Sequence, residues 1–174
     1  MSRYFLDLGC WNGVSTKLFF AGKLGVDPTG YRAFGFDPLK KYLKEMTELE
    51  SQYPFTFINK AVWKFDGEIE FGEFEKDESS SLKKEKVNFS TAKVYKVPCL
   101  DFSAWLGQFK EEDEIFVKMN IEGSEVDVLE YLMKTGNIKL IDKLIIEDHY
   151  NKVSGDYTRR MQKLEETLPI DWRF

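Results

Sequence analysis

Cysteine and histidine are scarce in this sequence, which has two cysteines and one histidine in 174 residues. Cys10 and Cys99 provide neither a disulfide framework nor the spacing of a cysteine-rich metal site. Long apolar runs are also missing: no stretch approaches the ~18 residues of a membrane span, and residues 1–7 lack the apolar segment of a signal peptide. These absences argue against a disulfide-rich secreted protein and a membrane partner, and they favour the reducing cytoplasm.

Basic residues are outnumbered by acidic ones, so the formal net charge is -5 and the isoelectric point is about 5.1. A protein that docks on phosphate backbones usually carries a basic stripe. The lysine cluster at residues 83–86 lies beside several acidic residues and is typical of a solvated loop. The sequence therefore argues against a nucleic-acid partner.

The chain does have a globular composition, with 43% hydrophobic and 32% charged residues. Its length fits one domain over residues 1–174, long enough to bury a sizeable core. The aromatic fraction of 16% is high. It indicates a core rich in phenylalanine, with a pocket for a flat ligand as the alternative.

Strand-like and helix-like segments alternate along the chain. Strand patterns cover residues 4–8, 31–36, 55–58, 94–97, 115–119 and 144–147, and helical patterns cover 14–21, 39–49, 102–109, 123–133 and 157–168. The alternation predicts an α/β fold with a mostly parallel central sheet and helices on both faces. Residues 169–174 leave room for one short terminal strand, so we expect a sheet shortened at its C-terminal end.

Several local features carry more specific expectations. The first helix is expected to turn three apolar residues toward the core: Val14, Leu18 and Ala21. Residues 61–63 and 68–71 are expected to pair as a hairpin, and the highly charged segment 73–86 is the expected mobile loop. Asp101 is expected to cap the helix that follows it.

The most informative segment is the loop after the first strand, Asp7-Leu8-Gly9-Cys10-Trp11-Asn12-Gly13. Its glycines allow a tight turn and a close approach of a ligand to the backbone, and the following helix offers unpaired N–H groups. The spacing differs from the Gly-x-Gly-x-x-Gly of a dinucleotide site, and Asp7 would repel a pyrophosphate. A carboxylate at this place suits the ammonium end of an amino acid, with a simple turn aspartate as the alternative.

A second carboxylate follows the second strand, in Phe36-Asp37-Pro38. A carboxylate at the tip of this strand can accept the two hydroxyls of a ribose, although Asp37 could instead cap the next helix. Together, Asp7 and Asp37 predict a ligand with an amino-acid end and a nucleoside end. S-adenosylmethionine has that shape.

Four stretches together resemble the FkbM family of class I, S-adenosylmethionine-dependent methyltransferases. They are the glycine loop, Phe36-Asp37-Pro38, Asn59-Lys60-Ala61-Val62 leading into Asp66-Gly67, and Val117-Lys118-Met119-Asn120-Ile121-Glu122-Gly123-Ser124-Glu125. Weaker matches are Ser79-Ser80-Ser81-Leu82, Val97-Pro98-Cys99-Leu100-Asp101 and Ile146-Glu147-Asp148-His149. The resemblance implies a Rossmann-like class I fold and O-methylation of a hydroxyl on a sugar, a glycan or a small molecule.

The resemblance also implies site residues. The expected cofactor site consists of Asp7, Gly9, Cys10, Trp11, Asn12, Gly13, Asp37, Pro38, Ala61, Val62 and Asn120. The expected acceptor site consists of Ser80, Ser81 and Glu147, although the serines are as compatible with a solvated loop. Glu125 opens a helix, where its charge would favour the positive end of the helix dipole.

The candidate catalytic residues follow neighbouring strands at the edge where open α/β sheets bind ligands: Lys118, Asn120, Glu122 and His149. Lys118 lies in an apolar strand and needs a partner, for which Glu122, Glu147 or His149 are candidates; a paired core charge is the alternative. His149 has an ordinary pKa of about 6.5, which suits a proton acceptor. Asn120 stands where the family frequently has aspartate, and an amide cannot act as a carboxylate base.

Other interpretations stay open at this point. Asn120, Glu147, Asp148 and His149 could surround a divalent ion such as Mg²⁺, but no spacing is diagnostic and no metal site is assigned. The competing functions are N-methylation and an inactive cofactor-binding module that serves a partner protein. An NAD-binding oxidoreductase is disfavoured by the glycine spacing. The identity of the acceptor and the oligomeric state do not follow from the residues.

Overall fold

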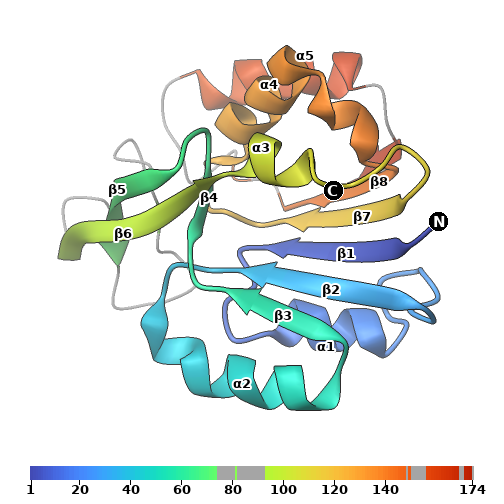
Figure 1. Ribbon diagram of the computed structural model, residues 1–174. Helices are drawn as coiled ribbons and strands as arrows, with labels where there is room; N and C mark the ends of the chain where they lie inside the picture. Colours follow the sequence, from blue (N-terminus) through green and yellow to red (C-terminus); the bar gives the residue numbers. More distant parts are fainter. Residues whose placement is uncertain (74–80, 82–92, 148, 150–155, 169–170, 174) are drawn as a thin grey trace.

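The computed structural model describes residues 1–73, 81, 93–147, 149, 156–168 and 171–173 (Figure 1). Its elements are β1 (Arg3–Leu8), α1 (Val14–Phe20), β2 (Tyr31–Phe36), η1 (Lys40–Tyr42), α2 (Leu43–Gln52), β3 (Phe55–Ile58), β4 (Ala61–Trp63), β5 (Gly67–Glu73), β6 (Lys93–Asp101), α3 (Phe102–Leu106), β7 (Glu114–Met119), α4 (Glu125–Thr135), η4 (Asn137–Leu140), β8 (Lys143–Ile146), α5 (Tyr157–Thr167) and β9 (Asp171–Arg173). None of the helices in these ranges is long and apolar enough to cross a membrane.

The main sheet has the strand order β3-β2-β1-β7-β8-β9, and every pair in it is parallel. β1 is hydrogen-bonded to β2 on one side and to β7 on the other, so the winding direction reverses beside it. The predicted parallel sheet is confirmed, and the predicted terminal strand is β9, paired with β8. In open α/β sheets such a reversal is where ligands bind, at the carboxyl ends of the strands.

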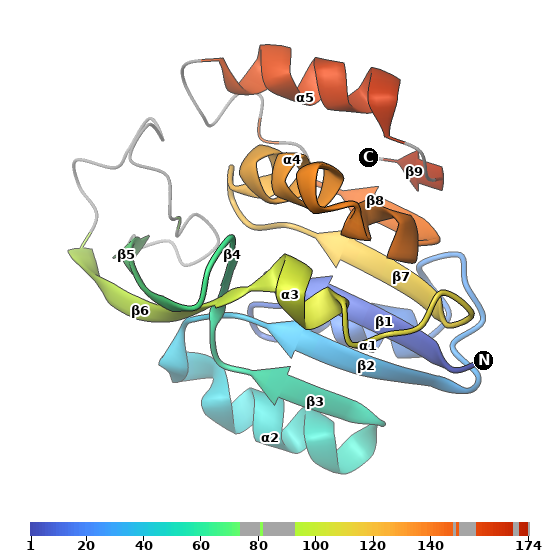
Figure 2. The same ribbon diagram turned by 45° about the horizontal axis from the view of Figure 1, so that its top comes forward.

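Helices cover both faces of the main sheet, as Figures 1 and 2 show. Successive side chains of a strand point to opposite faces, and β1 illustrates this alternation. Phe5 packs in the cluster that includes Phe19 of α1 and Met46 and Leu49 of α2. Leu6 and Leu8 pack in the larger cluster formed with α3, α4 and α5. The expected helices on both faces are therefore confirmed.

The smaller sheet corrects the predicted hairpin. Its order is β4-β6-β5, so β4 and β5 do not pair with each other. Ala61 of β4 and Gly67 of β5 are both registered with Cys99 of β6, one on each side. The intervening β6 is longer than the predicted strand at 94–97. One of its edges is hydrogen-bonded to β4 and the other to β5.

The first helix presents a different face to the core from the one predicted. Val14 and Leu18 are 46% and 37% exposed, and Ala21 is exposed beyond the end of α1. Thr16 and Phe19 are buried instead. Phe19 stacks on Phe5 with ring centroids 4.0 Å apart, so contacts with β1 decide which face turns inward. Leu43, the first residue of α2, is also 44% exposed.

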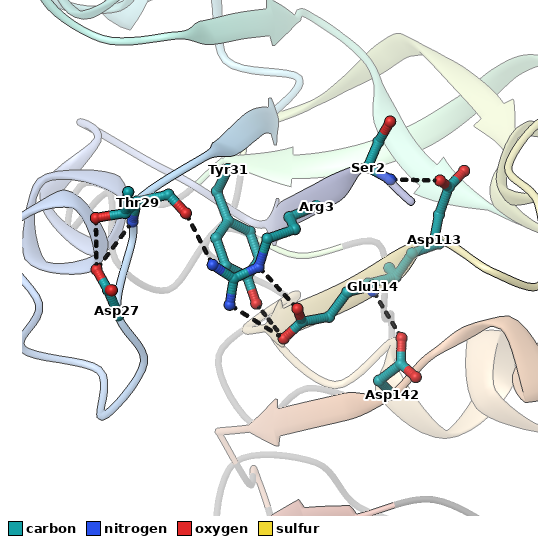
Figure 3. Close-up of polar contacts among 9 residues, drawn as sticks. Ser2, Arg3, Asp27, Thr29, Tyr31, Asp113, Glu114 and Asp142 are labelled. Carbon is teal, nitrogen blue, oxygen red and sulfur yellow. Dashed lines mark hydrogen bonds and ion pairs between the residues drawn. The ribbon is translucent and has the colours of Figure 1, made fainter.

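Polar contacts join the amino ends of β1, β2 and β7 (Figure 3). The Arg3 guanidinium donates to Glu114 Oε2 at 2.7 Å, and the Tyr31 hydroxyl donates to Glu114 Oε1 at 2.6 Å. Arg3 also lies 4.3 Å from the centre of the Tyr31 ring. Hydrogen bonds from Arg3 and Tyr31 lower the pKa of Glu114. This network fixes one end of the three central strands, and the glycine loop lies at the other end.

Candidate cofactor and active site

The glycine loop is held against the ends of β2 and β7. The amides of Gly9 and Cys10 donate to the Phe36 carbonyl oxygen at 2.9 and 3.1 Å. Gly9 has a φ of +75°, and a Cβ there would lie 1.8 Å from the carbonyl oxygen of Asn120. Both the left-handed backbone and the missing side chain are therefore required. The loop occupies the point where the winding of the sheet reverses.

Asp37 anchors this loop from β2. One carboxylate oxygen accepts the amide of Trp11 at 3.1 Å, and the other accepts the amide of Leu39 at 2.9 Å. Burial raises the pKa of Asp37 to about 6, and these two N–H donors oppose the rise. Asp37 thus stabilises the turn after β2, whereas the N-caps of η1 and α2 are Leu39 and Tyr42. Ribose binding stays a prediction, since each carboxylate oxygen can accept a further hydrogen bond.

Asp7 and Lys118 form a buried ion pair beneath the loop. Asp7 is completely buried; its Oδ2 accepts the hydroxyls of Ser15 and Thr16 at 2.6 and 2.8 Å. Its Oδ1 lies 3.1 Å from Lys118 Nζ, which also donates to the Gly9 carbonyl at 2.9 Å. The predicted partners of Lys118 are thereby corrected, because parallel pairing places Lys118 directly beside Asp7.

The pairing changes how Asp7 and Lys118 are interpreted. Asp7 has no exposed surface, and both of its oxygens face protein groups, which argues against direct contact with a ligand's ammonium. The two side chains instead tie β1, β7 and the start of α1 together under the glycine loop. The hydroxyls of Ser15 and Thr16 were missed by the sequence analysis, because a helical hydrophobic pattern gives no signal for a buried hydroxyl.

The remaining loop residues hold its conformation. Trp11 Nε1 donates to the Tyr42 hydroxyl at 2.5 Å, and Asn12 Oδ1 accepts the Val14 amide at 3.2 Å at the start of α1. Cys10 is buried, and burial raises the pKa of its thiol well above the ordinary value. Gly13 precedes α1 with a φ of +80°, and a Cβ there would meet Leu49 at 2.2 Å.

Three expected cofactor residues are engaged in packing. Ala61 and Val62 are 4% and 3% exposed. Ala61 packs in the cluster of the smaller sheet, and Val62 packs in the large core. Pro38 is half-buried beside Asp37. These positions shape the wall next to the glycine loop, and direct contact of any of them with a cofactor stays a prediction.

Asn120 and Glu147 meet at the carboxyl ends of β7 and β8. Asn120 Nδ2 donates to Glu147 Oε2 at 2.5 Å. Because a carboxylate only accepts hydrogen bonds, this contact fixes the orientation of the amide. Asn120 Oδ1 is then a buried acceptor with no hydrogen-bond partner among the described residues. Glu147 is exposed at this edge.

His149 lies between two carboxylates. Its Nδ1 is 3.1 Å from Glu125 Oε1, and its Nε2 is 3.4 Å from Glu122 Oε1. Burial lowers the pKa of His149, but the contacts with Glu122 and Glu125 outweigh that effect and raise it to about 9. The imidazole is therefore protonated at neutral pH, which argues against its predicted role as a proton acceptor.

The structure tests the predicted acceptor serines and the possible metal site only in part. Ser80 and Asp148, and most of the expected mobile loop at 73–86, lie outside the described residues. Ser81 is 1% exposed and donates to the Glu122 carbonyl at 2.6 Å, so it is not part of a solvated loop. Within the described ranges, no group of three or more His, Cys, Asp or Glu side chains could hold a metal ion.

Comparison with known proteins identifies the family from a match that covers most of the chain, although the glycine loop at residues 7–13 lies before the matched range. The family model described as Methyltransferase FkbM domain matches residues 24–168. No curated protein and no solved structure matches the chain. The match spans most of the chain, including Asp37, Asn120 and His149, and the parallel sheet agrees with a Rossmann-like methyltransferase fold. The chain belongs to the FkbM methyltransferase family.

Proposed function

We propose that this methyltransferase uses S-adenosylmethionine and transfers the methyl group to a hydroxyl of a sugar, a glycan or a small molecule. One observation carries the proposal: the glycine loop lies at the reversal point of the sheet, with Gly9 packed against the Asn120 carbonyl. Ligands of open α/β sheets bind in this crevice.

The polar groups around the loop fit such a cofactor. Asp37 and Asn120 Oδ1 are both hydrogen-bond acceptors. A ligand for this set must bring donors, and S-adenosylmethionine brings ribose hydroxyls and an ammonium. A pyrophosphate would bring further acceptors and negative charge, so the same set disfavours a dinucleotide.

The chain's own residues have defined tasks in the reaction. The cofactor, when bound, supplies an electrophilic methyl group on a sulfonium. Catalysis then requires alignment of the acceptor oxygen and removal of its proton. Lys118 and His149 are held in ion pairs with carboxylates, and Asn120 is an amide. Glu147, exposed and oriented by Asn120, is the carboxylate that we assign as proton acceptor for the hydroxyl.

The Glu147 assignment predicts the behaviour of Glu147→Gln. A glutamine keeps an oxygen that accepts from Asn120 but cannot take a proton at neutral pH. We expect methyl transfer to fall by about 100-fold, within the usual contribution of general bases, with cofactor affinity nearly unchanged. Glu112→Gln, an exposed carboxylate far along the chain, is the matched control. Equal turnover by Glu147→Gln and the unaltered protein would contradict the assignment.

The cofactor itself is tested by calorimetric titration with S-adenosylmethionine, S-adenosylhomocysteine and NAD. Micromolar binding of the first two without NAD binding supports the proposal, and no binding of any overturns it. A labelled methyl donor with a panel of sugars and glycans then identifies the acceptor. Labelling of an amine alone would instead indicate N-methylation.

The described cysteines are free and buried, which supports our assignment to the reducing cytoplasm.

A further inference from the structure

The segment between β7 and α4 contains an unusual turn. Glu122 has a φ of +55° and Gly123 a φ of +100°. A left-handed conformation is strained for a residue with a side chain, and it persists only where the surroundings enforce it. Asn120 lies directly before this turn, with its carbonyl against Gly9. The turn therefore helps to set one wall of the proposed cofactor site.

Glu125 holds the turn from the first residue of α4. Its Oε1 accepts the amide of Ile121 at 2.8 Å, and its Oε2 accepts the amide of Gly123 at 2.8 Å. Oε2 also accepts the Tyr157 hydroxyl of α5 at 3.2 Å. Glu125 is completely buried, so its carboxylate acts on the backbone of the turn and not on solvent.

His149 joins both ends of the turn. Its ring lies between Glu125 and Glu122, at the distances given above, and it is 1% exposed. The imidazole lies within 3.4 Å of both buried carboxylates, so its protonated form can pair with the two of them. Ser81 adds a contact from the side of the smaller sheet by donating to the Glu122 carbonyl. Helix α5, the segment after β8 and Ser81, which forms a β-bridge with Gly72 of β5, thus converge on one turn.

We propose that Glu125 and His149 are positioning residues: they lock the turn at Glu122 and thereby hold Asn120 and the glycine loop in the geometry that binds the cofactor. Neither side chain contacts the cofactor. Among the residues that the structure describes, the charged and titratable groups that face His149 are Glu122, Glu125 and, through Glu125, the Tyr157 hydroxyl. The inference rests on the proposed function, because its test uses S-adenosylhomocysteine.

The first test measures the pKa of His149 by nuclear magnetic resonance. His149 is the only histidine in the sequence, so its ring signals need no assignment against others. Its titration is followed without ligand and at saturation with S-adenosylhomocysteine. If the protonated clamp favours binding, binding must favour the protonated clamp by the same factor. We expect the pKa to rise by roughly 0.5–1 unit on saturation, which corresponds to about 3- to 10-fold coupling.

The second test uses Glu125→Gln, in which one oxygen replaces two as acceptor. We expect S-adenosylhomocysteine affinity at pH 7.5 to fall about 10-fold, within the usual range of coupling between sites, at a temperature where circular dichroism shows an intact fold. Glu130→Gln, on the exposed side of α4, is the matched control and should bind normally. If Glu125→Gln does not fold, the magnetic resonance titration of the unaltered protein decides alone.

The outcomes separate the two proposals. Absence of S-adenosylhomocysteine binding by the unaltered protein overturns the proposed function and this inference with it. Normal binding together with an unchanged His149 pKa overturns this inference alone. A normal affinity of folded Glu125→Gln overturns it as well, because the positioning role requires both effects.

Discussion

At the scale of single residues, Gly9 is a position that tolerates no side chain. A Cβ there would overlap the Asn120 carbonyl at 1.8 Å, whereas a Cβ on Gly30, with a similar φ of +77°, would meet no atom within 4 Å. We expect Gly30→Ala to lower the free energy of unfolding by about 1–2 kcal/mol, from backbone strain alone. Gly9→Ala should lose clearly more, because the backbone of β7 must also move. Urea denaturation of both variants tests this, and equal losses would contradict the close approach.

His149 predicts how stability depends on pH. Its folded pKa of about 9 lies above the ordinary value of about 6.5, so its protonated form stabilises the fold. This contribution is complete below about pH 6.5 and is lost as the pH rises through about 9, with a total on the order of 3 kcal/mol. Denaturation at pH 6.5, 8 and 9.5 should show the decline. His149→Gln should be less stable at pH 6.5 and nearly flat over this range.

At the scale of elements, substitutions on the two faces of α1 test which face is buried. Phe19 is completely buried against Phe5 and Phe116, so Phe19→Ala should cost about 3–5 kcal/mol of unfolding free energy. Val14 is 46% exposed, and Val14→Ala should change stability by no more than about 0.5 kcal/mol. Thermal denaturation distinguishes the two variants. A large loss for Val14→Ala would restore the face that the sequence pattern favoured.

The elements also show how far the sequence could predict this structure. Strands and helices were located well because apolar periodicity is a local property, and Asp101 caps α3 by accepting the Ala104 amide as predicted. The face of α1 was wrong because Thr16 is buried for its bond to Asp7, which no hydrophobic pattern records. The β4–β5 hairpin was wrong because β6, far along the chain, inserts between the two strands.

In the site, the glycine loop was located from its own residues, but its partners were not. Lys118 was expected to pair with Glu122, Glu147 or His149, which are nearby in sequence or follow the next strand. It pairs with Asp7. It also donates to the carbonyl of Gly9, which is 109 residues away in the sequence. Such pairings depend on strand order and register, and one sequence does not determine either. Glu125 was assigned to the helix dipole for the same reason, because its ties to Tyr157 and His149 are long-range.

At the scale of the whole molecule, the proposed ligand should stabilise the fold. A ligand that binds only the folded state at 100 times its dissociation constant adds about 2.7 kcal/mol. For a chain of this size that corresponds to a rise in the melting temperature of roughly 5–10 °C. We expect S-adenosylhomocysteine to produce this rise and NAD to leave the melting temperature unchanged. A thermal scan at several ligand concentrations measures it, and an equal response to both ligands would argue against a specific site.

The position of β1 in the middle of the main sheet has a consequence for synthesis on the ribosome. Arg3 and its partner Glu114 are separated by 111 residues, and translation proceeds at about 5–20 residues per second. During those seconds β1 can pair with β2 but not with β7, and Phe5 still lacks Phe116. The nascent chain therefore exposes an unpaired strand edge beside a phenylalanine-rich surface. Chaperone occupancy of translating ribosomes should rise once β1 and β2 have left the exit tunnel and fall once β7 has left it as well.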